Sequence, residues 1–440
     1  MVGKATVIAA AAEPIIPPVA QAAEAGEIAL KTPRATGMFA SLAIRDYKLL
    51  WWGMVVSNIG TWMQMVAQGF LVYQLTHSPF ALGLVGLVRA VPVFVFSLFA
   101  GVLADRVDRR KLLIVTQSLA GILALVLGIL ASTGVVKVWM IMVLAFLSSS
   151  VMSFDNPTRQ AMVPDIVGKE HIANAVALNS AAFNGTGVLG PSLAGAALGV
   201  VGVAACFYIN AVSFIAVIIA LFLMSPVPNQ IRSKRSMWQN LREGFGYVRG
   251  NRLVGALLIQ IALIGLLGRP YTQLMPAMQQ DVLHVGAGGL GTLMAFSGLG
   301  ALIGALVVAK LSEFKYRGLL LITSIAGMSI ALAGFALSRV FVVSLLLLVI
   351  VGCGTTIAMS TTNTMIQLSL PNELRGRVMS MYTMIMMGSM PLGAAILGSL
   401  ATGIGVPETL ALGAVGCLVA LLAVNFYAPA IRKPTEAATA

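Results

Sequence analysis

The sequence predicts an all-α membrane protein in which twelve transmembrane helices form two pseudo-symmetric bundles of six. The first reason is composition, because the 440 residues are 58% hydrophobic and only 10% charged, whereas about a quarter of the residues in a soluble protein are charged. The second reason is that apolar segments of about 20 residues, enough to cross a bilayer, recur along the chain. The third reason is a sequence repeat that relates the two halves of the chain.

The apolar segments follow one another with short polar gaps, which leave no room for a soluble domain between them. Because a helix rises about 1.5 Å per residue, each segment can span the hydrocarbon core. The predicted spans are residues 49–74, 80–103, 112–132, 137–157, 173–200, 203–224, 253–276, 287–309, 318–337, 341–362, 378–402 and 407–428.

These spans divide the chain into five regions. We expect a disordered cytoplasmic tail at 1–44, six-helix bundles at 45–224 and 253–429, a cytoplasmic linker at 225–252 and a cytoplasmic tail at 430–440. The amino-terminal tail is rich in Ala, Pro and Glu and lacks the continuous apolar core of a signal peptide.

The linker carries one apolar pattern of its own. Trp238, Leu241, Phe245 and Val248 recur at intervals of three or four residues, the spacing of one helical face. We therefore expect a short amphipathic helix that lies along the inner membrane surface.

The distribution of Lys and Arg predicts the orientation of the bundle. Of the 28 basic residues, only Lys137 and Arg339 lie in gaps on the side opposite the amino terminus, and only Arg89 and Arg269 lie within apolar segments. Because basic loops stay in the cytoplasm, both termini are expected to be cytoplasmic. This asymmetry also explains the net charge of +13 without a nucleic-acid partner.

The two halves of the chain repeat each other. Leu112-Leu113 matches Leu319-Leu320, and Pro164-Asp165 matches Pro371-Asn372 at the same offset. Two matched bundles in the same orientation are typical of transporters with a central binding site at the pseudo-symmetry axis. A channel or a membrane enzyme has less need of matched halves, so the repeat favours transport.

The pattern of reactive residues argues against an enzyme. The three cysteines lie within apolar runs, and no Gly-rich phosphate loop with a Lys is present. We therefore predict no metal site and no cofactor. The three histidines are scattered at gaps or span ends, at His77, His171 and His284.

The gap between the second and third spans carries the most specific motif in the chain. It contains a Gly, an Asp-Arg pair and a basic cluster, and it resembles the signature of the major facilitator superfamily. The matching residues are Gly101, Leu103, Asp105, Arg106, Arg109 and Arg110. Asp108 stands where the family usually has a second Gly. The resemblance covers about residues 40–430 and implies the major facilitator fold.

Four further motifs look like the enterobactin-exporter-like branch of that superfamily, which consists largely of bacterial exporters of siderophores, antibiotics and other amphiphiles. They are Arg45-Asp46-Tyr47, Asn58-Ile-Gly-Thr-Trp-Met-Gln64, Asp155-Asn-Pro157-Thr-Arg159-Gln and Arg375-Gly-Arg377-Val-Met-Ser. None of these motifs specifies a substrate.

The signature loop is expected to act as a latch. The Asp105 carboxylate can accept hydrogen bonds from Arg residues of its own loop or from Arg159, or face the positive end of the helix over 378–402. The resemblance implies that such contacts close the cytoplasmic side in the outward-facing state; alternatively, the cluster only sets the topology. The expected gating residues are Gly101, Asp105, Arg106, Arg109, Arg110, Arg159, Arg375 and Arg377.

A polar stripe on the first span suggests the lining of a substrate cavity. Asn58, Thr61, Gln64 and Gln68 lie on one helical face, and in the family the first, fourth, seventh and tenth spans line the cavity. The other spans add Gln260, Thr356 and Ser360. The alternative is that these groups hydrogen-bond between packed helices.

Arg89 lies near the middle of the second span. An Arg at that depth is costly and is a functional candidate by default. It could attract an anionic substrate, or it could be a structural partner between helices. Arg269 is placed near the outer end of its span, where a long side chain reaches the interface.

Gly190, Pro191 and Gly195 resemble the antiporter motif of the family, which exporters carry more often than importers. Small residues let helices approach closely. We expect them to pack the span at 173–200 against the span at 287–309 in the other half. The alternative is that they are ordinary small residues at a helix contact, with no bearing on the direction of transport.

The acidic residues all lie outside the central membrane, and Asp155 is the deepest. The candidates for proton coupling are Asp155 and Asp105, with Asp46 behind them.

The sequence therefore predicts a proton-coupled exporter of an amphiphilic small molecule, such as a drug or a siderophore, in the bacterial inner membrane. Its partners are the substrate, protons and the lipid bilayer, and we expect a monomer. One alternative is an importer or facilitator of a small organic anion, suggested by Arg89. Another is a non-transporting membrane scaffold, which would leave the polar stripe unexplained.

Overall fold

The structure is a computed structural model that describes residues 39–225, 245–311 and 314–432. The side chains of 97–102, 104–106, 169, 184 and 372–373 lie outside the described part. Within these limits the chain contains helices and no strands, so the predicted all-α class is confirmed.

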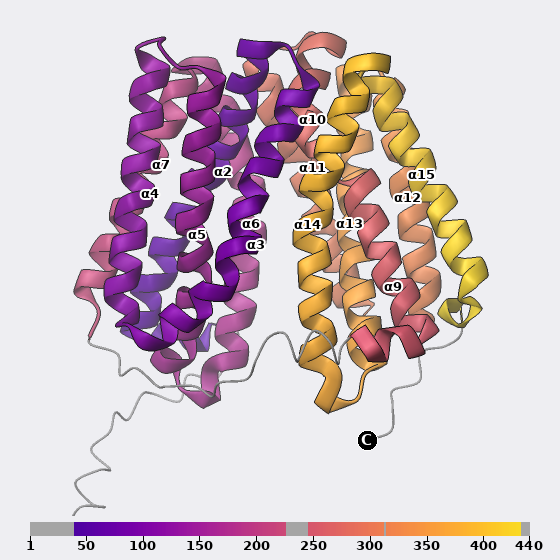
Figure 1. Cartoon of the computed structure of the whole chain (residues 1–440), viewed down its shortest axis with the longest axis horizontal. Coiled ribbons are helices and arrows are strands. Elements are labelled where there is room, and N and C mark those ends of the chain that lie inside the picture. Colours follow the sequence, from indigo (N-terminus) through magenta and orange to yellow (C-terminus); the bar gives the residue numbers. More distant parts are fainter. Residues whose placement is uncertain (1–38, 226–244, 312–313, 433–440) are drawn as a thin grey trace, which may run out of the picture.

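The helices form two bundles that stand side by side (Figure 1). The first bundle contains α2 (Arg45–Thr76), α3 (Pro79–Arg106), α4 (Arg109–Ser132), α5 (Val138–Val167), α6 (Ile172–Val200) and α7 (Val203–Leu223). The second contains the composite span α9 (Arg252–Leu263), η3 (Ile264–Gly268), α10 (Tyr271–Ala277) and η4 (Met278–Val282), followed by α11 (Ala287–Lys310), α12 (Arg317–Leu337), α13 (Phe341–Leu368), α14 (Asn372–Ile404) and α15 (Val406–Tyr427). Short 3-10 helices flank them at η1 (Ala40–Ala43), η2 (Lys169–His171) and η5 (Pro429–Arg432).

Ten of these helical spans are both long enough and apolar enough to cross a membrane. Of the twelve predicted spans, those that correspond to α2 and α6 do not meet this criterion. In α2, Asn58 and Gln64 lower the mean hydropathy, and α6 carries several Asn, Ser and Gly residues. Polar groups in a membrane helix need partners inside the protein, so both helices should pack against other helices.

The end of the bundle where α2 begins and α15 ends carries Arg45, Lys48 and the Arg109–Lys111 cluster, and we call it the basic end. At this end Asp108 is the N-cap of α4. Its carboxylate accepts hydrogen bonds from the backbone N–H groups of Arg110 and Lys111, at 2.9 and 3.2 Å. The residue that departs from the usual Gly of the signature therefore starts a helix.

The composite span in the second bundle differs from the single helix expected over 253–276. Two π-helical turns interrupt it, and it continues to Val282. Pro270 and Pro276 cannot donate backbone hydrogen bonds, and the N–H of Arg269 bonds to the carbonyl of Ile264, five residues back. Proline was visible in the sequence, but apolar periodicity does not reveal a π turn.

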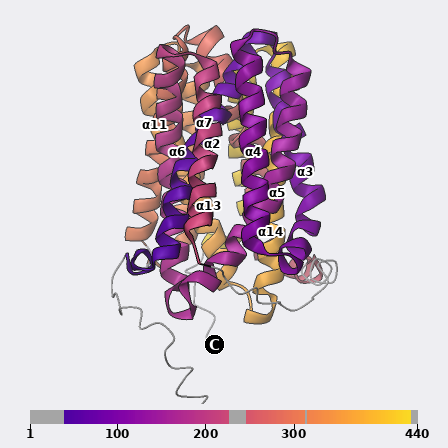
Figure 2. The same ribbon diagram turned by 90° about the vertical axis from the view of Figure 1, so that its left-hand side faces the viewer.

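Glycine contacts hold the two bundles together along two seams. Helix α6 packs along α11, and α3 packs along α14 (Figure 2). A Cβ atom at Gly195 would lie 2.5 Å from the Cα atom of Gly291, and one at Gly83 would lie 2.2 Å from the carbonyl oxygen of Ala394. The helices can meet at these points only because the residues there have no side chain.

The first and seventh spans also meet, at the end opposite the basic end. The Tyr73 hydroxyl on α2 donates a hydrogen bond to the Asp281 carboxylate on η4. Beside it, His77 Nδ1 lies 3.4 Å from Gln280 Nε2. Pro276 packs close to Gly69 one turn deeper. Among the described contacts, those that join these two spans lie at this end, and the ribbons there lie close together (Figure 1).

The expected amphipathic helix falls partly outside the described residues, because Trp238 and Leu241 lie there. Residues 245–250 are helical. Val248 packs against the main core, whereas the Phe245 side chain is 62% exposed.

Replacing Gly195 by Ala should destabilise the protein by about 1–3 kcal/mol, because the new methyl group overlaps the backbone of α11. The measurement is the midpoint of thermal unfolding in detergent. Gly199→Ala is the matched control, since a Cβ atom there meets nothing closer than 3.9 Å. Both substitutions raise helix propensity equally, so an equal effect of the two would contradict this packing.

Candidate functional site

The polar side chains along α2 do not all lie in the same environment. Gln64 Oε1 accepts a hydrogen bond from Asn210 Nδ2 of α7 at 2.7 Å, and the Gln64 side chain is buried inside the first bundle. The Thr61 hydroxyl donates to the carbonyl of Ser57 in its own helix at 2.9 Å. Asn58 is half-buried. Only part of the predicted stripe is therefore available to a substrate.

Gln68 on α2 contacts Arg89 on α3. Its Oε1 accepts a hydrogen bond from Arg89 Nη2 of α3. The Gln68 side chain is 1% exposed, and its Nε2 has no hydrogen-bond partner among the described residues. The ion pairs of the described chain involve other arginines, so no carboxylate neutralises Arg89 there. Within the described part of the chain, this half-buried guanidinium has no counter-charge.

The sequence placed Arg269 near the outer end of its span, but the structure does not. The helical segment extends from Arg252 to Val282, which leaves about 20 Å of helix beyond Arg269. Arg269 therefore lies near the middle of the span, immediately after the π turn. It is half-buried, and the phenols of Tyr271 and Tyr382 lie near it. No carboxylate of the described residues pairs with it.

The packing of α3 against α10 relates the two arginines. A Cβ atom at Gly86 would lie 3.6 Å from Gln273 Nε2. Arg89 follows Gly86 by one helical turn toward the basic end, and Arg269 precedes Gln273 by about one turn in the same direction. Arg89 of the first bundle and Arg269 of the second thus lie at a similar depth, on the basic side of the contact between Tyr73 and Asp281.

The remaining predicted cavity residues lie in different surroundings. Gln260 is 1% exposed, and both atoms of its amide lack a hydrogen-bond partner among the described residues. Thr356 packs against α11, because a Cβ atom at Gly304 would lie 3.1 Å from its Cβ. Ser360 is half-buried. The structure does not bring these three together with Arg89.

Asp155 forms a buried polar cluster between α4 and α5. Its Oδ1 accepts hydrogen bonds from the Thr116 hydroxyl at 2.9 Å and from Gln117 Nε2 at 2.6 Å. Its Oδ2 forms an ion pair with Arg159 one turn along α5. The Asp155 side chain is 0% exposed. A carboxylate at this depth is tolerated because each oxygen has partners.

The described gating residues also bind within the first bundle. Arg109 forms a buried ion pair with Asp165 at the end of α5. Arg110 Nη2 donates to the carbonyl of Phe222, at the end of α7, at 2.9 Å. Both contacts tie α4 to its neighbours at the basic end.

The other gating and coupling candidates lie elsewhere. Arg375 is exposed and Arg377 is half-buried. Asp46 Oδ2 accepts a hydrogen bond from the N–H of Ser225 at 3.3 Å. The side chains of Gly101, Asp105 and Arg106 lie outside the described residues.

The antiporter-like motif serves two interfaces. Gly190 packs against Trp62 of α2, since a Cβ atom there would lie 2.4 Å from Trp62 Cβ. Gly195 packs against α11 in the other half. Of the expected contacts with the span at 287–309, the structure shows the one at Gly195 and also brings the carbonyl of Pro191 close to Gly291.

Sequence reasoning missed Asp165 and Asp281. Asp165 follows a Pro after the fourth predicted span, and an acid there opposite a basic loop is a usable signal. Asp281 gave no signal, because its partner Tyr73 lies in the other half of the chain.

A family model described as "transmembrane secretion effector", within the major facilitator group, matches residues 36–439. Among curated proteins, the chain is 27% identical over 355 residues to the staphyloferrin A transporter of Staphylococcus aureus, which covers 80% of this chain and 88% of that protein. It is 26% identical over 345 residues to the enterobactin exporter EntS of Escherichia coli O1:K1, which covers 78% of this chain and 82% of that protein.

Solved structures share the fold at low identity. A mutant form of the nucleoside transporter NupG has a TM-score of 0.68 at 12% identity and covers 87% of this chain and 98% of its own. A bacterial homologue of the iron transporter ferroportin in an inward-facing state has a TM-score of 0.67 at 16% identity, covering 88% and 98%. Because the family match spans nearly the whole sequence, the chain belongs to the transmembrane secretion effector family of major facilitator transporters and is a membrane transporter, not an enzyme.

Proposed function

We propose that this transporter is a secondary active exporter of an amphiphilic small molecule, driven by proton antiport across a bacterial inner membrane. Support for export comes from relatives that are named as a staphyloferrin A transporter and an enterobactin exporter. Because the identities are only 26–27%, we infer the substrate class from the residues of this chain and not from the names of its relatives.

In this proposal the basic end faces the cytoplasm, and both termini lie there. Arg45, Lys48, Arg109, Arg110 and Lys111 gather at that end, and cytoplasmic loops of membrane proteins carry such an excess of basic residues. The end closed by Tyr73 and Asp281 then faces outward.

Alternating access is supported by where the bundles touch. The contact between the first and seventh spans is made at the outer end through Tyr73 and Asp281, below which Arg89 and Arg269 lie. A substrate would enter from the cytoplasm, and export would need the outer contact to open. The glycine seams between α6 and α11 and between α3 and α14 would persist through the change.

The observation that carries this function is the pair of arginines, one in each bundle, that have no carboxylate partner among the described residues. A charged residue in the middle of a membrane helix costs about 2.5–3.5 kcal/mol on insertion scales. An acidic group of the substrate would supply the missing counter-charge. By touching Arg89 and Arg269 together, it would also link the bundles, so binding would favour one arrangement of the halves over the other.

Proton coupling is assigned to Asp155 in this scheme. Its carboxylate holds Arg159, Gln117 and Thr116 in one cluster that joins α4 to α5. Protonation would remove the ion pair and weaken that link, which would couple proton uptake to the packing of the first bundle. Proton antiport requires this cluster to take up a proton in the state that is open to the outer side and to release it in the state that is open to the cytoplasm.

Flux in proteoliposomes tests export and coupling together. With the basic end outside, labelled staphyloferrin A or enterobactin should accumulate when the lumen is made more acidic than the bath. Accumulation should collapse with a protonophore. Flux that ignores both the gradient and the protonophore would exclude proton antiport, and no uptake of any compound from a wider siderophore and drug panel would exclude export of such amphiphiles.

Arg89→Gln should weaken binding of an acidic substrate about 10- to 100-fold, the range expected when one charged hydrogen bond is lost. Isothermal titration on purified protein measures it, and Arg89→Lys should retain part of the affinity. Arg339→Gln removes a charge in the gap between α12 and α13 and serves as the control. Equal affinities for Arg89→Gln and wild type would remove this arginine from the substrate site.

Tyr73→Phe should shift the protein toward opening at the outer end, because the hydrogen bond to Asp281 is lost. Spin labels at Val135 and Val340, both more than half exposed in outer gaps of different bundles, report the change in separation. A several-fold larger population of long distances is expected, since one charged hydrogen bond contributes about 1.5–3 kcal/mol before screening. An unchanged distance distribution would show that this bond does not hold the end closed.

A further inference from the structure

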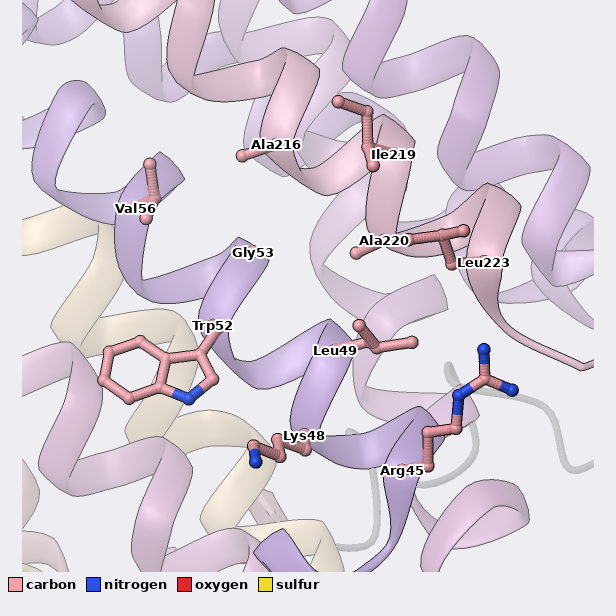
Figure 3. Close-up of a pocket in the computed structure, with 10 residues that line it drawn as sticks. All are labelled: Arg45, Lys48, Leu49, Trp52, Gly53, Val56, Ala216, Ile219, Ala220 and Leu223. Atoms are coloured by element: carbon pink, nitrogen blue, oxygen red, sulfur yellow. The ribbon is translucent and has the colours of Figure 1, made fainter.

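A groove opens on the surface of the first bundle between α2 and α7, at the basic end (Figure 3). It encloses about 560 Å³. Its floor is made by Gly53, Ala216 and Ala220. Gly53 allows α2 to approach α7 closely, because a Cβ atom there would lie 3.2 Å from the Cα atom of Val217.

Larger apolar side chains form the rims of the groove. On α2 they are Trp52 and Val56, 53% and 43% exposed, and on α7 they are Ile219 and Leu223, both 52% exposed. Figure 3 shows the Trp52 ring on one side and Leu223 on the other. Large apolar residues this exposed on a membrane helix face the lipid.

Two cations lie at the basic end of the groove. Arg45 and Lys48 are exposed, and neither side chain has a hydrogen bond or ion pair among the described residues. The one carboxylate on the same helical turn, Asp46, is engaged by the N–H of Ser225. Arg110 binds the carbonyl of Phe222 beside the groove and adds a third positive charge nearby.

The length of the groove matches one leaflet of a bilayer. From Arg45 to Val56 along α2 the rise is about 16 Å, whereas half of the hydrocarbon core measures about 15 Å. Trp52 lies about 10 Å along the same rise, on the rim of the apolar part. The charged end thus lies at headgroup level and the apolar part at acyl-chain level.

We propose that this groove is a binding site for one anionic phospholipid, with its phosphate at Arg45 and Lys48 and an acyl chain between α2 and α7. The apolar lining alone would accept any lipid of the leaflet. The two cations select an anionic headgroup. This site is separate from the substrate region, because both of its walls belong to the first bundle.

The test measures lipid binding to the purified, delipidated full-length protein by native mass spectrometry. Phosphatidylglycerol is compared with phosphatidylcholine of the same acyl chains. Each cation near an anionic surface contributes roughly a fivefold preference, so the pair should favour phosphatidylglycerol about 25-fold. Equal binding of the two lipids would overturn the proposal.

Two double variants test whether the preference for phosphatidylglycerol arises at this groove. Arg45→Gln with Lys48→Gln should abolish the preference for phosphatidylglycerol, whereas Lys310→Gln with Lys315→Gln, which removes the same charge between α11 and α12, should leave it unchanged. Equal losses in both double variants would mean that net charge, and not this groove, attracts the lipid.

Ala216→Leu fills the floor without changing the charge and should weaken phosphatidylglycerol binding several-fold. Glycerol phosphate at millimolar concentration should not displace the lipid, because it lacks an acyl chain for the groove. Full displacement by glycerol phosphate, or unchanged lipid binding by Ala216→Leu, would show that only a phosphate is bound and would also overturn the proposal.

Discussion

The architecture depends on one constraint: the interior of a bilayer offers no hydrogen-bond partners, so polar groups must be satisfied within the protein. Most of this chain meets the constraint with regular helices. Three features of the described residues depart from it. They are the π turns of the seventh span, the two mid-depth arginines and the buried cluster around Asp155. Each needs either an internal partner or one supplied from outside.

These departures differ in how fully they are compensated. Asp155 has partners for both oxygens, so it can remain buried in the first bundle. Among the described residues, Arg89 has an amide oxygen as its partner, and Arg269 lies near phenols, but neither has a carboxylate. The Asp155 carboxylate thus has its partners within the protein, whereas the two arginines have no carboxylate partner among the described residues. A buried carboxylate is suited to exchange a proton, whereas an incompletely neutralised cation is suited to bind an anion.

Much of the fold could be predicted from the sequence, because hydropathy, basic gaps and the repeat are local patterns. The observed helices begin and end near the predicted positions, except where polar turns extend α5, α13 and α14 or where Pro270 and Pro276 disrupt the seventh span. The site was less predictable. Gln64 looked like part of one stripe with Gln68, but its partner Asn210 lies on the sixth span and only folding brings them together. Tyr73 and Asp281 are likewise joined by the fold alone.

The seam between α6 and α11 has one more consequence. At Gly195 and Gly291 the two backbones face each other with no side chain between them. Interlocked side chains would have to lift out of their holes before one helix could roll over the other. Where two backbones touch directly, no interlocked side chains have to separate. In the alternating-access scheme proposed above, the bundles could therefore rotate about this seam with a small energy barrier while α6 and α11 stay in contact.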